Sequence, residues 1–168
     1  QCKNSSDSFF LSCLFASTKV CNEIQNFRLR CKEEEVLDYK KVNCGSSVLH
    51  ENDTFSYCYF EYFENRNDFL KEGQAALDKH LKNPYFDARH EEHDLIYHSV
   101  IPWVHFTQFK HARQKREGDS IPRVTFGKVL ETPPGKFQMP VSLEVNHALR
   151  DGFFHADMHQ GNLKVGPS

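Results

Sequence analysis

The sequence predicts a two-layer α/β sandwich, in which helices cover one face of a mostly antiparallel mixed sheet. Three observations lead to this fold class. The 168 residues fall within the usual size of one domain. The expected elements follow one another in the order helix, strands, helix, strands, helix. Strands joined directly by hairpin turns favour antiparallel pairing, and the few helices suffice for one face only.

The helices are predicted from the spacing of apolar residues. Residues 8–24 carry apolar side chains at helical spacing. Residues 65–81 form the clearest helical pattern, with Asn65 or Asn67 as the N-cap and Pro84 ending the helix. A last helix is expected to begin at Asp151.

The strands are predicted from alternation and from β-branched or aromatic residues. Extended structure is expected again over residues 104–109, after Pro102 breaks a strand. The segment Thr132-Pro-Pro-Gly135 predicts a hairpin turn between the last two strands. The expected strands cover residues 27–31, 36–42, 54–62, 95–101, 123–131 and 137–146.

The charge balance excludes some classes of partner. With 21 basic and 23 acidic residues, the net charge is −2, which gives no overall attraction to nucleic acid or an anionic membrane. No window approaches the ~18 apolar residues of a membrane helix. We therefore expect no nucleic-acid partner and no membrane. One basic cluster, at residues 110–116, is typical of a solvated loop, although steering of an anionic ligand stays open.

Cysteine and histidine patterns predict neither disulfides nor a metal site. The six cysteines include no Cys-x-x-Cys pair, and their spacing matches no disulfide framework. We therefore expect reduced thiols in a cytoplasmic protein. The pairs His90/His93 and His155/His159 have spacings that could ligate a metal, but no motif supplies a third ligand. Exposed loop histidines are the simpler interpretation.

Residues 145–152 combine a strand end with a histidine and a carboxylate. Apolar alternation ends before His147, and Asp151 stands where it could cap the following helix. A histidine held at a strand end can serve as a general base. A surface histidine with a capping aspartate gives the same pattern, and on spacing alone this structural interpretation is the more ordinary one.

The motif His-x-x-x-Asp-Gly at a strand-to-helix junction resembles the signature of the chloramphenicol acetyltransferase family. It is shared with the lipoyl acyltransferases and peptide-synthetase condensation domains. Further segments resemble motifs of the family in the same order along the chain. They are residues 26–28, 53–56, 99–109, 124–128 and 138–147. The resemblance implies a fold like that of the CoA-dependent acyltransferases, forming a single but partial domain over residues 1–168.

The resemblance also implies a reaction and its catalytic residues. The reaction is acetyl transfer from acetyl-CoA, as co-substrate, to a hydroxyl of chloramphenicol or a similar small xenobiotic, with no metal required. His147 corresponds to the general base that deprotonates the hydroxyl. Ser99 corresponds to the residue whose hydroxyl hydrogen-bonds the tetrahedral oxyanion. Asp151 corresponds to a structural carboxylate that pairs with an arginine.

Binding residues follow from the same resemblance. Phe55 and Phe86 correspond to aromatic walls of the acceptor pocket, and Thr125 to a threonine that contacts substrate through water. Trp103 and Lys128 correspond to residues near the CoA channel. Because the family's active sites lie between subunits, a homotrimer is implied. Without the resemblance, Trp103 and Phe55 would be read as core residues, Ser99 as a satisfied buried hydroxyl and Lys128 as a solvated strand residue.

Departures from the family pattern keep an alternative open. Asn146 replaces a second histidine, Gln108 replaces a serine, and His111 stands where a small apolar pocket residue is expected. The family's N-terminal segment, which supplies the arginine partner of the motif aspartate, is not matched. The alternative is therefore a catalytically inactive relative that acts as a binding or scaffold protein.

Overall fold

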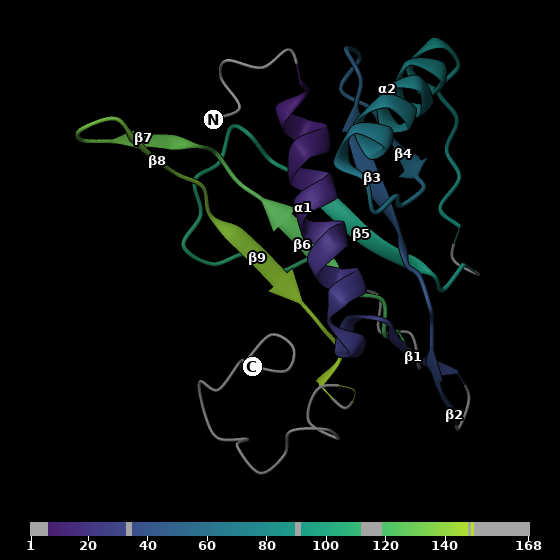
Figure 1. Ribbon diagram of the computed structural model, residues 1–168. Coiled ribbons are helices and arrows are strands. Elements are labelled where there is room, and N and C mark those ends of the chain that lie inside the picture. The colour runs from purple at the N-terminus through teal and green to yellow at the C-terminus, as the bar shows by residue number, and fades with distance from the viewer. Residues whose placement is uncertain (1–6, 33–34, 90–91, 112–118, 148, 150–168) are drawn as a thin grey trace.

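The computed structural model describes residues 7–32, 35–89, 92–111, 119–147 and 149. Within them, two helices and a short 3₁₀ helix accompany nine strands (Figure 1). The helices are α1 (Phe9–Glu23), η2 (Gln25–Phe27) and α2 (Arg66–Lys82). The strands are β1 (Leu29–Lys32), β2 (Glu35–Asp38), β3 (Asn43–Leu49), β4 (Phe55–Phe60), β5 (Leu95–Val100), β6 (Arg123–Phe126), β7 (Leu130–Thr132), β8 (Lys136–Gln138) and β9 (Val141–Glu144).

The main sheet has five strands in the order β4-β3-β5-β6-β9. Its two central pairings, β3 with β5 and β5 with β6, are parallel, and its two outer pairings are antiparallel. The hairpins β1–β2 and β7–β8 add two more antiparallel pairings. Four of the six described pairings are therefore antiparallel, and the predicted mixed, mostly antiparallel sheet is confirmed.

Both described helices have a side-chain N-cap, and that of α2 is the predicted Asn65. The Ser8 side chain accepts a hydrogen bond from the backbone N–H of Leu11, and the Asn65 side chain accepts from those of Asn67 and Asp68. These contacts satisfy N–H groups that the first helical turn leaves unpaired. The boundaries differ from the predicted ones by one residue at most, because caps and spacing are local signals.

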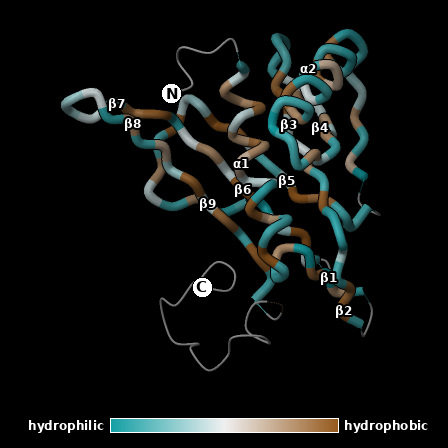
Figure 2. Tube along the Cα trace, in the orientation of Figure 1, coloured by the Kyte–Doolittle hydropathy of each residue, from teal (hydrophilic) through white to brown (hydrophobic). Residues whose placement is uncertain are grey.

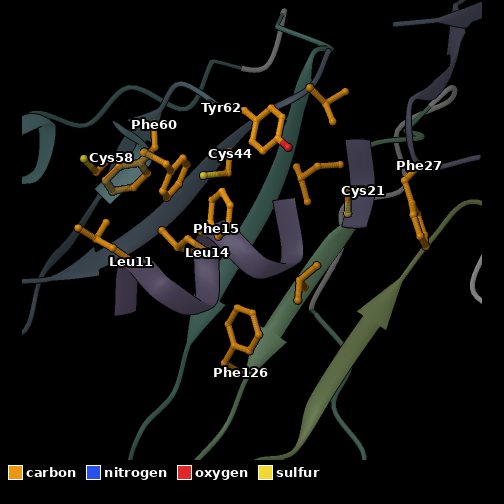
Figure 3. Packing of buried hydrophobic residues seen from close by; sticks show 14 residues of the cluster. Leu11, Leu14, Phe15, Cys21, Phe27, Cys44, Cys58, Phe60, Tyr62 and Phe126 are labelled. Atoms are coloured by element: carbon orange, nitrogen blue, oxygen red, sulfur yellow. The ribbon is translucent and has the colours of Figure 1, made fainter. Parts of the chain in front are cut away.

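The two helices pack against the same side of the main sheet, and α1 lies across it (Figure 1). Phe15 of α1 contacts Phe69 of α2 with ring centroids 5.5 Å apart. Leu14, Phe15, Cys44 and Phe126 belong to the buried cluster between the layers (Figure 3). The Kyte–Doolittle colouring shows hydrophobic stretches in α1 and in the sheet, while most of α2 is hydrophilic (Figure 2). The apolar face of each helix is thus buried in one core.

Arg30 of β1 is fully buried and joins the β1–β2 hairpin to the main sheet. Its guanidinium donates hydrogen bonds to the backbone carbonyls of Phe27, Leu29, His93 and Leu95, at 2.7–2.8 Å. Burial lowers the pKa of Arg30 to about 10, so the side chain remains charged at neutral pH. The four carbonyls replace the water that this charge would otherwise require.

Several features of the sheet differ from the sequence-based prediction. The interior strand β3 covers residues 43–49, where no strand is predicted. The predicted strand 123–131 is divided into β6 and β7, and the predicted strand 137–146 into β8 and β9. Residues 104–109 form no strand. The expected hairpin turn is present between β7 and β8, in a separate two-stranded sheet.

The division of these strands coincides with a close approach of the backbone at Gly127. A Cβ atom there would lie 2.6 Å from Pro140 Cγ and 2.9 Å from the carbonyl oxygen of Val104. The Gly127 N–H donates to the Pro140 carbonyl at 2.9 Å, while Pro140 has no N–H with which to return a bond. The ladder between β6 and β9 therefore ends here, and the chain turns into the β7–β8 hairpin.

Candidate functional site

Ser99 and Thr125 lie side by side on the face of the sheet that points away from the helices. They are register partners on the parallel strands β5 and β6. The residue before Ser99, His98, points the other way and hydrogen-bonds Ser17 of α1 at 2.8 Å. Because side chains alternate along a strand, Ser99 must face the opposite side. Ser99 is partly buried, whereas Thr125 is completely buried.

His111 contacts both hydroxyls with one ring nitrogen. His111 Nε2 lies 3.3 Å from Ser99 Oγ and 3.4 Å from Thr125 Oγ1. The imidazole therefore lies over the sheet at the level of these two residues. Its side chain is 22% exposed, so this polar cluster is accessible from solvent.

Glu144 of β9 holds the other side of the His111 ring. Its Oε1 accepts a hydrogen bond from the His111 backbone N–H at 2.8 Å and lies 2.5 Å from His111 Nδ1. A carboxylate at this distance keeps a proton on Nδ1, which leaves the lone pair of neutral His111 on Nε2. Nε2 can then accept a proton from either hydroxyl. Glu144, His111, Ser99 and Thr125 thus form one hydrogen-bonded cluster from three strands and a loop.

Further contacts position the loop that carries His111. Ser142 Oγ donates to the Phe109 carbonyl at 3.1 Å, and the Phe109 ring meets the His111 ring edge to face at 5.0 Å. Arg123 and Asp119 form an ion pair at 2.8 Å, and Asn146 Nδ2 donates to the Asp119 carbonyl at 3.1 Å. The two ends of the loop are therefore fixed to β6 and β9.

Phe55 and Phe86 meet on the same face as Ser99, at the far edge of the sheet. Their ring centroids are 5.9 Å apart, and Tyr57 lies against both rings. Phe55 is 49% exposed and Phe86 65%. They line an open groove of about 750 Å³. The reading of Phe55 as a core residue is therefore wrong, and the two predicted wall residues are brought together.

Trp103 and Lys128 lie in neighbouring segments at the carboxyl ends of β5 and β6. Trp103 is 61% exposed in the turn after β5. The next residue, Val104, accepts a hydrogen bond from the Lys128 backbone N–H at 2.7 Å. The core reading of Trp103 is wrong as well, because the indole is available to a ligand.

Of the two motif residues near the end of the chain, His147 is among the described residues and Asp151 is not. His147 is exposed and begins a helical turn three residues after the end of β9. Asp151 lies outside the described residues, and so does the helix expected to begin there.

The sequence reasoning did not identify the pairing of His111 with Glu144. From the sequence, His111 is only a departure from an apolar pocket residue, and Glu144 has no predicted role. One signal was present: Ser142 and Glu144 alternate with Leu143 and so share a face of their strand. The partner of Glu144, however, depends on a contact 33 residues away.

The described residues contain neither a cluster of metal ligands nor a membrane-spanning helix. No group of three or more His, Cys, Asp or Glu side chains in that part of the chain could hold a metal ion. His90, His155 and His159 lie outside it. No described helix is long and apolar enough to cross a membrane. The five described cysteines are free thiols.

Comparisons with known proteins agree on one family. A family model described as chloramphenicol acetyltransferase matches residues 1–162. A chloramphenicol acetyltransferase from Proteus mirabilis is 27% identical over 162 residues, which are 96% of this chain and 72% of that protein. Another, from Vibrio anguillarum, is 28% identical over 143 residues, 83% of this chain and 66% of that protein.

Solved structures show the same relationship. A chloramphenicol acetyltransferase structure superposes with a TM-score of 0.77 at 27% identity, covering 89% of this chain and 73% of the other. A dihydrolipoamide acetyltransferase from Azotobacter vinelandii gives a TM-score of 0.62 at 18% identity, covering 89% of this chain and 64% of the other. The second likeness shows a shared fold alone.

Proposed function

Since the chain belongs to the chloramphenicol acetyltransferase family, we propose that it transfers an acetyl group from acetyl-CoA to a hydroxyl of chloramphenicol or a similar small xenobiotic. The observation that carries this proposal is the placement of the Ser99 hydroxyl beside Thr125, on the face of the sheet that the helices leave open. An open groove lined in part by Phe55 and Phe86 lies at the β4 edge of the sheet. It offers an apolar acceptor a surface on which to pack.

In the proposed reaction, neutral His147 removes the proton of the acceptor hydroxyl, and the oxygen attacks the thioester carbonyl. The carbonyl becomes a tetrahedral oxyanion, which accepts a hydrogen bond from the Ser99 hydroxyl. The carbon–sulfur bond then breaks, and the CoA sulfur takes the proton from His147. Trp103 and Lys128 are proposed to contact CoA, and Asp151 to order the motif. No step in this scheme requires a metal.

The strand register supports an active site shared between subunits. Ser142 is the cross-strand partner of Thr125, which in turn pairs with Ser99. His147 lies five residues beyond Ser142 along the chain, past the end of β9 at Glu144, and a stretch of that length spans at most about 17 Å. We therefore propose that His147 acts on a Ser99 supplied by a neighbouring subunit of a homotrimer.

The proposal is tested with His147→Ala and Ser99→Ala in an assay that follows CoA thiol release in the presence of chloramphenicol. We expect kcat/KM to fall by about 10²–10⁴-fold without the general base. It should fall by roughly 10²–10³-fold without the oxyanion donor. The melting temperatures of both variants, compared with that of the wild type, serve as the folding control.

A wild-type chain that acetylates no hydroxyl acceptor would contradict the enzymatic proposal. Calorimetry with CoA then separates the remaining possibilities. CoA binding without turnover would indicate the alternative of an inactive relative that binds ligand.

A further inference from the structure

A continuous line of polar atoms runs from Glu144 through His111 to Ser99. Glu144 Oε1 is 2.5 Å from His111 Nδ1, and His111 Nε2 is 3.3 Å from Ser99 Oγ. The order carboxylate, imidazole, hydroxyl is that of an activated serine nucleophile, which is recognised by geometry rather than by sequence position.

We propose that Ser99 is itself an acyl acceptor, with His111 as its base and Glu144 orienting the imidazole. The expected activity is slow hydrolysis of the CoA thioester through an acetyl-Ser99 intermediate when no alcohol is bound. This inference rests on the proposed function only in that acetyl-CoA reaches the site.

The two contacts of Glu144 give the His111 ring one orientation and one tautomer. The same Oε1 accepts from the backbone N–H of His111 and from its Nδ1, so the ring cannot turn over without losing a hydrogen bond. Nε2 is then the basic nitrogen, and it faces the hydroxyls. The Glu144 side chain is 14% exposed and that of His111 is 22%, which limits competition from bulk water while leaving access to a ligand.

Two hydroxyls compete for Nε2, and their burial assigns them different roles. Thr125 Oγ1 lies 3.4 Å from the same nitrogen, but Thr125 is completely buried. Ser99 is only partly buried, so a thioester can reach it. A neutral Nε2 accepts one proton at a time. Thr125 stays a buried hydrogen-bond partner of the ring, and Ser99 is the hydroxyl that gives up its proton.

The chemistry balances without any other reactant than water. Ser99 Oγ bonds to the thioester carbonyl carbon while its proton moves to His111 Nε2. The carbon–sulfur bond breaks, and the leaving sulfur takes that proton to give CoA thiol and acetyl-Ser99. His111 then takes a proton from water, whose oxygen attacks the ester. Breakage of the ester bond releases acetate, and the proton returns to Ser99 Oγ.

The experiment incubates the full chain with acetyl-CoA and no alcohol, quenches it in acid, and locates acetyl groups by peptide mass spectrometry. CoA thiol release is recorded in parallel. We expect acetyl-Ser99 in the wild type and in His147→Ala. Thiol release should fall by about 100-fold in His111→Gln, which lacks the base, and by a smaller factor in Glu144→Gln. Ser99→Ala should show neither label nor release.

Ser47 provides the matched control. It lies on the same face one strand away, because Ser46 is the register partner of His98 on β5. Ser47→Ala should leave labelling and thiol release unchanged, and Ser47 should carry no acetyl group. Melting temperatures of all variants show whether they fold, and Glu144→Gln keeps an acceptor oxygen for His111.

The outcomes separate this inference from the proposed transfer reaction. Absence of acetyl-Ser99, equal labelling of Ser47, or labelling unaffected by His111→Gln overturns the inference. Loss of the label in His147→Ala also overturns it, because His147 would then be the base. Chloramphenicol acetylation can fail independently while acetyl-Ser99 still forms.

Discussion

Among single residues, His98 connects the core to the candidate site. It precedes Ser99, stacks on Phe126 with ring centroids 6.1 Å apart, and hydrogen-bonds Ser17 of α1. Burial lowers its pKa from 6.5 to about 4. The imidazole is therefore neutral in the folded protein at a pH where the unfolded chain already binds a proton.

The pKa of His98 predicts how stability depends on pH. Between pH 6.5 and 4 the unfolded state binds more protons at this position than the folded state, so the free energy of unfolding falls as the pH is lowered. The loss amounts to about 3 kcal/mol across that window. Urea unfolding of wild type and His98→Gln at pH 7 and pH 4.5 measures it. The glutamine variant should lose less stability on acidification.

An exposed histidine provides the control for this measurement. His105 lies in the loop after β5, where its Nδ1 faces the Lys128 carbonyl. His105→Gln should reproduce the wild-type pH dependence. If His98→Gln and wild type lose equal stability, burial of His98 is not the cause of the acid sensitivity.

Individual site residues were predictable to the extent that their roles depend on local motifs. Ser99 and Thr125 were singled out in advance, and the structure joins them through adjacent strands. The pair His111–Glu144 was not, because it requires the register of β9 on β6 and the path of a loop over the sheet. Neither is encoded in residue spacing along the chain.

Among the elements, β3 shows why an interior strand of the sheet was not predicted from the sequence. Its sequence, Asn-Cys-Gly-Ser-Ser-Val-Leu, contains few residues with high β-propensity. It is a strand because β4 and β5 hydrogen-bond to it on both sides. Its parallel partner β5 begins only after β4 and α2, so the pairing is a long-range one. The helices, by contrast, follow from local caps and spacing.

Gly45 of β3 gives a prediction about this strand. A Cβ atom there would lie 2.9 Å from the Tyr59 ring. That ring cannot move easily, since its hydroxyl donates to the Asp87 carbonyl at 2.6 Å and Arg89 covers its face. Gly45→Ala should therefore destabilise the protein by about 1–3 kcal/mol, measured as a lower denaturant midpoint at unchanged m-value.

Gly73 of α2 is the matched control for this substitution. Its added Cβ would meet the methyl groups of Leu11, at 3.3 Å and 3.7 Å, and Phe60 Cδ1 at 3.7 Å, and alanine is favoured over glycine inside a helix by roughly 0.5–1 kcal/mol. Gly73→Ala should thus be neutral or stabilising. Equal destabilisation by both changes would argue against a specific clash with Tyr59.

On the scale of the whole molecule, the helices cover one side of the sheet and leave the other to the candidate site. That open side carries Ser99 in the middle and the exposed rings of Phe55 and Phe86 at one edge. His147 follows β9 at the opposite edge. Only one member of the proposed catalytic pair, Ser99, lies on the side that carries this exposed apolar surface. A second subunit that covers the surface would complete the site.

This arrangement predicts that two inactive variants restore activity when they assemble together. In a mixed trimer of His147→Ala and Ser99→Ala subunits, the first contributes an intact Ser99 and the second an intact His147. With random assembly, about a quarter of the intersubunit sites contain both residues. The variants are unfolded together, refolded as a mixture and assayed with acetyl-CoA and chloramphenicol, and each variant refolded alone is the control. If each site lay within one chain, the mixture would show only the average of the two residual activities.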